Sequence, residues 1–337
     1  MSGFVTVSIG SGLVDSIFGK CQVPLASYIE KQGEAFERES VMKYLFSFNP
    51  SRHWAEQYSS ETAMDDFVPV GEGGEYPRTG FEEGYNRIIE NMTFKQSFSV
   101  TQELVEDANL GAMKQRARKL ITAYGRTREK FGRALYAGGI YGTTVNFGGK
   151  SFACNGADGL ALFHKEHANK VDGKKQSNLY KGAFSATLLG KIETEMQQVT
   201  GDNGELLAVS PDTIWIPNDA ALKDAVFSAV GADKEPATSN NAYNVQYGRW
   251  NIIVDPYLTQ MLRVMGKTDK PFFLLDSKFM QNGDGAIFQE RKKLEVKSVI
   301  DQNNDNNSWR GRARFGAGFV DWRFVAAGNI STGKDLS

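Results

Sequence analysis

The chain has 337 residues, of which 41% are hydrophobic and 23% charged, and its formal net charge is -1. This length allows a sizeable core and predicts two domains. The near-neutral charge excludes a dedicated nucleic-acid-binding protein, which normally has a basic excess. Two cysteines, Cys21 and Cys154, are too few for a disulfide framework. The sequence shows no signal-peptide pattern, and it contains no apolar run of the roughly 20 residues that a bilayer requires. We therefore expect synthesis in a reducing cytoplasm and no membrane insertion.

The first 60 residues contain short apolar clusters, such as the one between Val41 and Phe48, mixed with glycine and charge. These clusters show no sustained period of either helix or strand. The pattern predicts an N-terminal arm rather than a domain.

Glycine and proline punctuate residues 69–84, and polar and apolar residues alternate over residues 87–99. This chemistry predicts a long two-stranded hairpin over Thr62–Ser97 with a flexible tip. Residues 61–107 contain eleven acidic and three basic side chains, which gives -8. Because an isolated hairpin is marginal in water, we expect it to lie on another surface.

A long helix is predicted over residues 101–137, with a hydroxyl cap at Thr101, an apolar stripe on one side and an end before Gly138. Gly125 and Gly132 each weaken it by up to about 1 kcal/mol relative to alanine. Close packing or a bend at these two points would explain them.

The predicted helix is strongly basic, since residues 114–133 contain eight basic side chains and only Glu129 as an acid, which gives +7. Charge along a solvated helix face is common, and that interpretation stays open. Apart from Glu129, which precedes Arg133 by four residues, acidic partners at this spacing are absent, and this favours a docking surface instead.

The middle of the chain begins with a glycine-rich loop over residues 140–182, followed by a helix that Ser185 caps and Gly201 closes. A compact α/β pattern comes next, with a polar loop at Gly231–Tyr243. Its predicted elements are a strand at Thr213–Ile216, a helix at Asp219–Val230, and strands at Trp250–Val254 and Phe272–Leu275.

The tail predicts a hairpin of two long strands with one buried face. The first strand alternates over residues 294–298, and a polar turn follows at Asp301–Asn307. In the second strand apolar residues at 309, 313, 315, 317 and 319 share one face, and the other face carries Arg310, Arg312 and Arg314.

Residues with catalytic chemistry are sparse. His164 and His167 flank a glutamate, but a zinc-protease motif needs His-Glu-x-x-His. Cys154 precedes His164 by ten residues, so a thiol–imidazole nucleophile is a further alternative, although no acyl-transfer motif surrounds it. We interpret the histidines as a hydrogen-bonded loop and the thiol as half-buried, and we expect no catalytic residue, metal or cofactor.

The order of these parts resembles the major capsid proteins of tailed bacteriophages with the HK97-like fold. From about Phe152 onward the chain is similar to the Mu-like major head subunit family. The motifs that carry this similarity are Cys154–Gly159, Leu162–His167, Ser177–Leu179, Ser210–Pro217 and Trp250–Leu258.

The resemblance implies an α+β HK97-like capsid fold with an N-terminal arm, an extended E-loop hairpin, a peripheral domain with a spine helix, and an axial α/β domain. The boundaries that we assign are arm 1–60, E-loop 61–98, peripheral domain 99–204 with the spine helix at 101–137, axial domain 205–285, and returning peripheral strands 286–337.

It also implies a structural protein that forms hexamers and pentamers of an icosahedral shell around double-stranded DNA, with assembly in the bacterial host cytoplasm. The expected partners are further copies of the chain, a separate scaffolding protein, a portal, possible decoration proteins, and DNA held non-specifically. An encapsulin-like compartment is the nearest alternative, and a metal- or thiol-dependent hydrolase is a distant one.

We expect each hairpin to lie over the next subunit, with its acidic side chains against the basic helix. The expected E-loop interface residues are Asp65, Asp66, Glu72, Glu75, Glu82, Glu83, Arg87 and Lys95. Those of the spine helix are Lys114, Arg118, Arg126 and Arg133, and those of the capsomer axis loop are Lys234, Glu235, Asn240 and Asn241.

Overall fold

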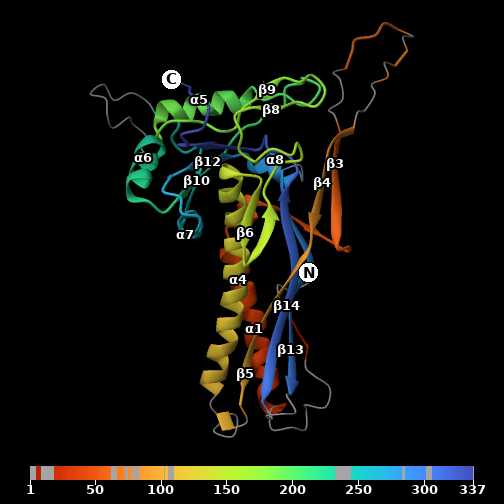
Figure 1. The fold of residues 1–337 in the computed structure, drawn as a ribbon, viewed down its shortest axis with the longest axis vertical. Helices are drawn as coiled ribbons and strands as arrows, with labels where there is room; N and C mark the ends of the chain where they lie inside the picture. The colour runs from red at the N-terminus through yellow and green to blue at the C-terminus, as the bar shows by residue number, and fades with distance from the viewer. Residues whose placement is uncertain are drawn as a thin grey trace.

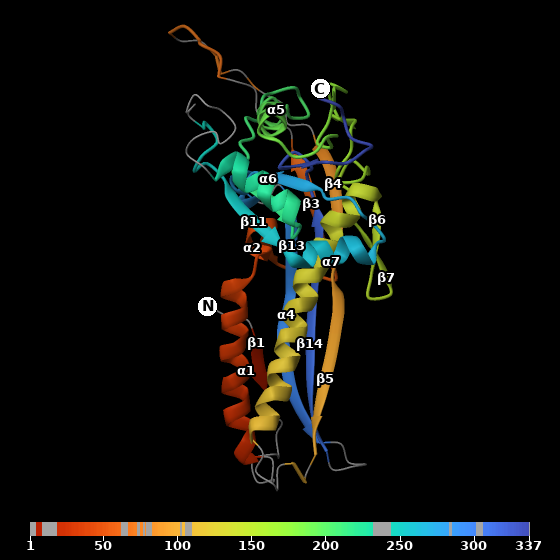
Figure 2. The ribbon, with the colours of Figure 1, turned by 90° about the vertical axis from the view of Figure 1, so that its left-hand side faces the viewer.

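The computed structural model is elongated, with a compact α/β unit at one end (Figure 1). It describes residues 5–8, 19–61, 67–72, 75–76, 78, 83–101, 103–104, 110–231, 244–282, 285–300 and 306–336. Helices α1 (Gly19–Glu39) and α4 (Leu110–Tyr141) run along the long axis beside a sheet of long strands (Figure 2).

The long sheet has five strands, and its central pair is the antiparallel hairpin of β13 (Ala286–Ile300) and β14 (Asn307–Phe319). On one side β5 (Met92–Val100) pairs antiparallel with β14. On the other side β1 (Val5–Ser8) and β2 (Ser47–Pro50) each pair parallel with β13. The predicted tail hairpin is therefore the centre of the sheet.

The inner face of this sheet is apolar and packs against α4. Trp309 and Phe315 are 1% exposed, and Phe94 of β5 stacks on Phe315 with ring centroids 4.1 Å apart. Burial of such large aromatic rings dominates the energetics of a core. The alternation read in the tail is confirmed, because Arg310 and Arg312 are exposed on the opposite face.

Helix α4 contains 32 residues and continues through Gly138 and Gly139, so the predicted end before Gly138 was wrong. The reason is close packing, since a Cβ on Gly138 would lie 2.7 Å from the Cβ of Val145. The close packing expected at Gly125 and Gly132 is confirmed, because a Cβ there would meet the ring of Phe36 and the sulfur of Met42.

The arm contains regular structure that we did not predict. Helix α1 packs against α4, the short α2 (Met42–Leu45) follows it, and β2 joins the long sheet. The buried positions of α1 include Ile29 and Gly33, with Phe36 half-buried. Their spacing is helical, but the glycine leaves the apolar stripe too weak to recognise in the sequence.

The hairpin consists of β3 (Ala55–Glu61) and β4 (Glu83–Glu90), so it begins earlier than predicted. Its second predicted strand divides at Asn91, after which β5 joins the long sheet. Asn91 ends the hairpin through its side chain, whose Nδ2 donates to Ser51 Oγ at 2.7 Å and to the His53 carbonyl at 3.0 Å.

The compact unit contains a four-stranded sheet in the order β11-β10-β12-β15. Its strands are β10 (Thr213–Pro217), β11 (Asn251–Asp255), β12 (Phe272–Leu275) and β15 (Val325–Gly328). Around it lie α5 (Ala186–Gln197), α6 (Ala220–Val230), α7 (Pro256–Val264) and α8 (Ser277–Gln281).

The cap predicted at Ser185 is present, since its side chain accepts the backbone N–H of Leu188. Asp219 caps α6 in the same way, which we did not predict. Strand β15 pairs with β12, although we had placed all of residues 286–337 with the peripheral strands. Between α4 and α5 lie the two small hairpins β6 (Thr144–Phe147) with β7 (Lys150–Ala153), and β8 (His167–Ala168) with β9 (Lys175–Gln176).

Candidate assembly surfaces

The upper part of α4 is fastened to the compact unit by a buried ion pair. Arg133 is 1% exposed, and its Nε lies 2.7 Å from Oδ2 of Asp255. The same carboxylate accepts from Trp215 Nε1 at 3.1 Å and caps α7 at the N–H of Tyr257. Glu129 contacts Arg133 from one turn earlier. Arg133 therefore holds this chain together, and its assignment to a subunit interface is corrected.

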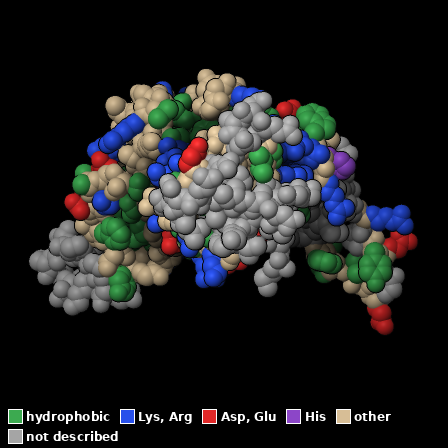
Figure 3. Space-filling model, turned by 90° about the horizontal axis from the view of Figure 1, so that it is seen from below, with side chains coloured by type: hydrophobic (Ala, Val, Ile, Leu, Met, Phe, Trp, Pro, Cys, Tyr) green, Lys and Arg blue, Asp and Glu red, His purple; other side chains and the backbone are tan. Residues whose placement is uncertain are grey.

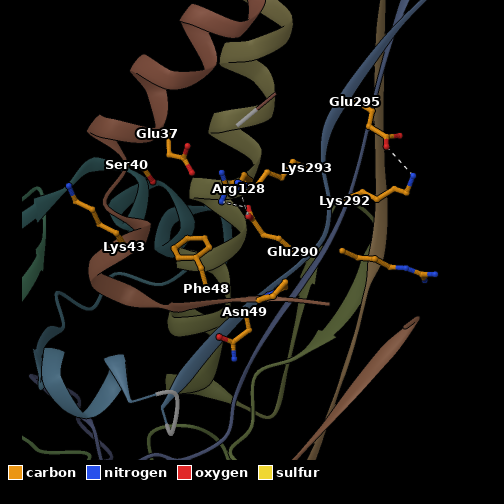
Figure 4. Close-up of a pocket in the computed structure, with 12 residues that line it drawn as sticks. Glu37, Ser40, Lys43, Phe48, Asn49, Arg128, Glu290, Lys292, Lys293 and Glu295 are labelled. Atoms are coloured by element: carbon orange, nitrogen blue, oxygen red, sulfur yellow. Dashed lines mark hydrogen bonds and ion pairs between the residues drawn. The ribbon is translucent and has the colours of Figure 1, made fainter. Parts of the chain in front are cut away.

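A second internal pair joins α4 to the long sheet. Arg128 Nη2 lies 2.6 Å from Oε1 of Glu290, and its guanidinium sits 5.2 Å from the ring of Phe288 and 5.5 Å from that of Phe48. The pair borders a groove of about 840 Å³ between α1, β2 and β13 (Figure 4). The sequence did not reveal this site, because its residues come from four separated segments.

Three of the four basic residues of α4 that we predicted at a subunit interface lie on the solvent-facing side of the helix. Lys114, Arg118 and Arg126 are exposed and form a row with helical spacing. No ion pair involves them among the described residues. This row is available to a partner.

The acidic segment, which we define as residues 61–83, has seven acidic side chains and one basic, which gives -6. Glu72 and Glu75 are exposed, and nearby Phe67 and Tyr76 are 103% and 93% exposed. Seen from below, hydrophobic, acidic and basic side chains share the projecting part at the right (Figure 3). Glu83 begins β4, whereas Asp65, Asp66 and Glu82 lie outside the described residues.

The two basic residues assigned to the E-loop lie elsewhere than at its tip. Arg87 is half-buried on β4, and its buried Nε has no hydrogen-bond partner in the described part of the chain. Lys95 is exposed on β5 and belongs to the long sheet. Lys170 anchors the hairpin near the tip end of its ladder, where its Nζ donates to the Gly84 carbonyl at 2.7 Å.

The histidine loop is an internal hydrogen-bonded structure, as predicted. His167 is fully buried, its Nδ1 lies 2.5 Å from Oδ2 of Asp158, and its ring stacks on Trp322 at 4.3 Å. Burial raises the pKa of the Cys154 thiol to about 12, so the thiol is protonated at neutral pH. A nucleophilic cysteine requires the opposite shift.

Three further findings bear on the predicted sites. The described residues contain no group of histidine, cysteine or acidic side chains arranged to hold a metal ion. None of the described helices has both the length and the apolar composition needed to cross a bilayer. The residues assigned to the capsomer axis, Lys234, Glu235, Asn240 and Asn241, lie outside the described residues.

Comparison with known proteins identifies the family. The model of a phage capsid protein family matches residues 89–328, which is more than half of the chain. No curated protein sequence matches the chain. The finer resemblance to Mu-like head subunits is not tested by these matches and stays a prediction.

Solved capsids share the fold at low sequence identity. The capsid of Ralstonia phage GP4 is similar with a TM-score of 0.54 and 8% identity, over 85% of this chain and 87% of that chain. The capsid of cyanophage P-SCSP1u is similar with a TM-score of 0.52 and 8% identity, over 86% and 87% of the two chains. The chain therefore belongs to the phage capsid protein family, and it is a structural major capsid protein with the HK97-like fold.

Proposed function

We propose that this capsid protein forms hexamers and pentamers of an icosahedral shell that encloses double-stranded DNA. The observation that carries the proposal is the acidic segment, which exposes Phe67 and Tyr76 beside Glu72 and Glu75. A projecting segment with uncovered aromatic rings is marginal in water unless another surface covers it. In a shell, the next subunit supplies that surface.

The proposed partners beyond further copies are a separate scaffolding protein, a portal, possible decoration proteins, and the packaged DNA. The net charge of -1 supports a wall along which DNA slides, because affinity for phosphate grows with each basic contact. Assembly in the cytoplasm of a bacterial host belongs to the same proposal.

The proposal includes two roles for the surfaces that we assigned from the sequence. The exposed row Lys114, Arg118 and Arg126 contacts a neighbouring copy or the shell contents. The loop of residues 231–243 lines the axis of each capsomer. Exposed ion pairs contribute only about 0.2–1 kcal/mol each, so such contacts set the register and apolar burial supplies the stability.

Purification followed by size-exclusion chromatography and negative-stain electron microscopy tests the proposal. We expect capsomers or shells, with or without a candidate scaffolding protein. A monomer of 37.3 kDa at every salt concentration, with scaffold added as well, would contradict it. Shells that contain protein cargo instead of DNA would favour the encapsulin-like alternative.

A further inference from the structure

One edge of β13 is covered by two different strands that leave a gap between them. Strand β2 pairs along Ile287–Glu290, and β1 pairs along Leu294–Lys297. Residues 291–293 have no strand partner on this edge in the part of the chain that the structure describes. Pro50 lies opposite Glu290 at the end of the β2 ladder, and proline has no N–H with which to continue it. The gap therefore exposes a short piece of sheet edge.

A double β-bulge lies in the same gap. From Glu290 to Glu295 β13 advances five residues, whereas β14 advances only three, from Phe315 to Arg312. The extra residues disturb the alternation of the strand, so four consecutive charged side chains, 290–293, all line the groove of about 840 Å³ between α1, β2 and β13. Bulges of this kind re-aim side chains next to functional sites. We call this groove the bulge groove.

The bulge groove is polar and has an excess of positive charge. Eight of its twelve lining residues are charged, five of them basic and three acidic, which gives +2. Two of the acids are already paired within the groove, Glu290 with Arg128 at 2.6 Å and Glu295 with Lys292 at 3.0 Å. The positive excess is therefore open to an occupant.

Lys43 and Arg291 provide this excess from two walls of the groove. No ion pair involves either of them among the described residues. In the view of Figure 4, the ring of Phe48 lies between Lys43 and Lys292. This ring is 38% exposed and lies 5.5 Å from the guanidinium of Arg128. An occupant therefore needs negative charge and an apolar side chain.

The chemistry of the groove favours a peptide over nucleic acid. An extended peptide adds to an open sheet edge through its main chain, and its alternate side chains then enter the groove. Basic side chains on an edge discourage pairing with most strands, so an acidic strand is selected. A DNA backbone could not pair with the edge in this way, and its phosphates would meet the carboxylates of Glu37 and Glu290.

We propose that the bulge groove binds an extended acidic segment of a separate protein that co-assembles with this one, an inference that rests on the proposed function. About three residues of the segment pair with residues 291–293, which span about 10 Å. Its carboxylates meet Lys43 and Arg291, and one apolar side chain lies on Phe48. A separate partner agrees better with the charged lining than a second copy does, because permanent interfaces between subunits are mainly apolar.

Binding of a synthetic peptide tests this chemistry. The probe is a short fluorescein-labelled peptide in which glutamate and leucine alternate, added to the unassembled protein and followed by fluorescence anisotropy. We expect saturable binding that weakens as salt is raised. The same peptide with lysine in place of glutamate should bind at least about tenfold more weakly, because like charges across a contact are strongly unfavourable. Equal binding of the two peptides, or no binding of either, would overturn the proposal.

Matched charge reversals locate the binding site. The double variant K43E/R291E should weaken binding of the acidic peptide by about tenfold or more. R118E/R126E makes the same charge change on the exposed side of α4 and should stay within about twofold of wild type. Because Arg291 is half-buried, the exposed single variant Lys43→Glu is a second test that leaves the fold intact, with a loss of up to about fivefold. An equal loss for the helix variant, or no loss for either groove variant, would overturn the proposal.

Two competitors reveal other occupants. A short DNA duplex that displaces the peptide, and that binds K43E/R291E about tenfold more weakly than wild type, would assign the groove to nucleic acid. Self-association of the wild-type chain in the ultracentrifuge, blocked by the peptide and abolished in K43E/R291E, would assign it to a second copy. Either result would overturn the proposal.

Hydrogen exchange tests the pairing at the sheet edge and separates this inference from the proposed function, because it needs no shell. The amides of residues 291–293 should exchange more slowly when the acidic peptide is bound, and unchanged rates would overturn the proposal. Protection and binding in a protein that never forms capsomers or shells would support the groove and contradict the proposed function. Shells formed by a protein that does not bind the peptide would contradict the groove alone.

Discussion

The two ends of helix α4 use their positive charge in opposite ways. Near the compact unit, Arg128 and Arg133 are buried and paired with Glu290 and Asp255. Toward the other end, Lys114, Arg118 and Arg126 face solvent. A single basic run in the sequence therefore contains one group of residues that holds the chain together and another that is open to partners.

The largest effect should follow from breaking the buried pair. Removing one partner of such a pair leaves an uncompensated buried charge, so Arg133→Ala should lower the free energy of unfolding by about 3–5 kcal/mol. Denaturant unfolding of the unassembled protein measures this. Arg126→Ala, an exposed neighbour on the same helix, is the control and should change it by less than about 0.5 kcal/mol. Equal losses in the free energy of unfolding for the two variants would show that Arg133 and Arg126 contribute alike to the stability of the chain.

A smaller effect should follow from filling the close contact at the end of α4. Gly138→Ala places a methyl group 2.7 Å from the Cβ of Val145, and overpacking of this kind costs about 1–3 kcal/mol. Alanine recovers up to about 1 kcal/mol of helix propensity. We expect a net loss in thermal and denaturant stability.

Gly190→Ala in α5 is the matched control for that variant. A Cβ there would have no atom within 4 Å, so only the gain in helix propensity remains. Its melting temperature should rise slightly. A rise for Gly138→Ala as well would mean that the end of α4 is less tightly packed than the structure shows.

The pH dependence of stability offers a smaller test. Burial raises the pKa of Cys154 from 9.0 to about 12, so its contribution is fully present below pH 9 and is lost as pH rises toward 12. Unfolding of Cys154→Ala should therefore depend less steeply on pH in this range. Alkylation of Cys154 in the native protein, followed by mass spectrometry of the peptide that contains it, should also be slow at neutral pH. Fast alkylation of Cys154 itself would contradict its burial.

The smallest effect on the stability of the monomer is expected at the exposed basic residues of α4. Arg118→Gln should leave the free energy of unfolding within about 0.5 kcal/mol of wild type, because the side chain is exposed and has no ion pair among the described residues. Denaturant unfolding checks this. A loss of more than 1 kcal/mol, roughly the upper limit for an exposed pair, would place Arg118 in the fold.

The elements predicted most accurately from the sequence are those whose hydrophobic periodicity matches the burial of their side chains in the structure. Strand Phe272–Leu275 was placed with its observed bounds, because four consecutive buried residues read as a central strand. The tail hairpin followed from strict alternation around Trp309 and Phe315. The cap at Ser185 followed from local chemistry.

The elements that were missed depend on contacts between distant segments. Helix α1 has a weak apolar stripe and is held by α4, where Phe36 fills the space that Gly125 leaves open. The glycines at 138 and 139 read as a helix end, although they permit close packing within the helix. Burial of Arg133 could not be read from its neighbours, because its partner Asp255 is 122 residues away.

The most direct measurement of the central claim is a cryo-electron microscopy map of assembled wild-type particles at side-chain resolution. It should show Arg133 paired with Asp255 inside each subunit, and the exposed row Lys114, Arg118 and Arg126 facing a neighbouring copy or the shell contents. A map in which Arg133 faces another subunit, or in which Lys114, Arg118 and Arg126 are buried within their own chain, would contradict the division between internal and exposed charges.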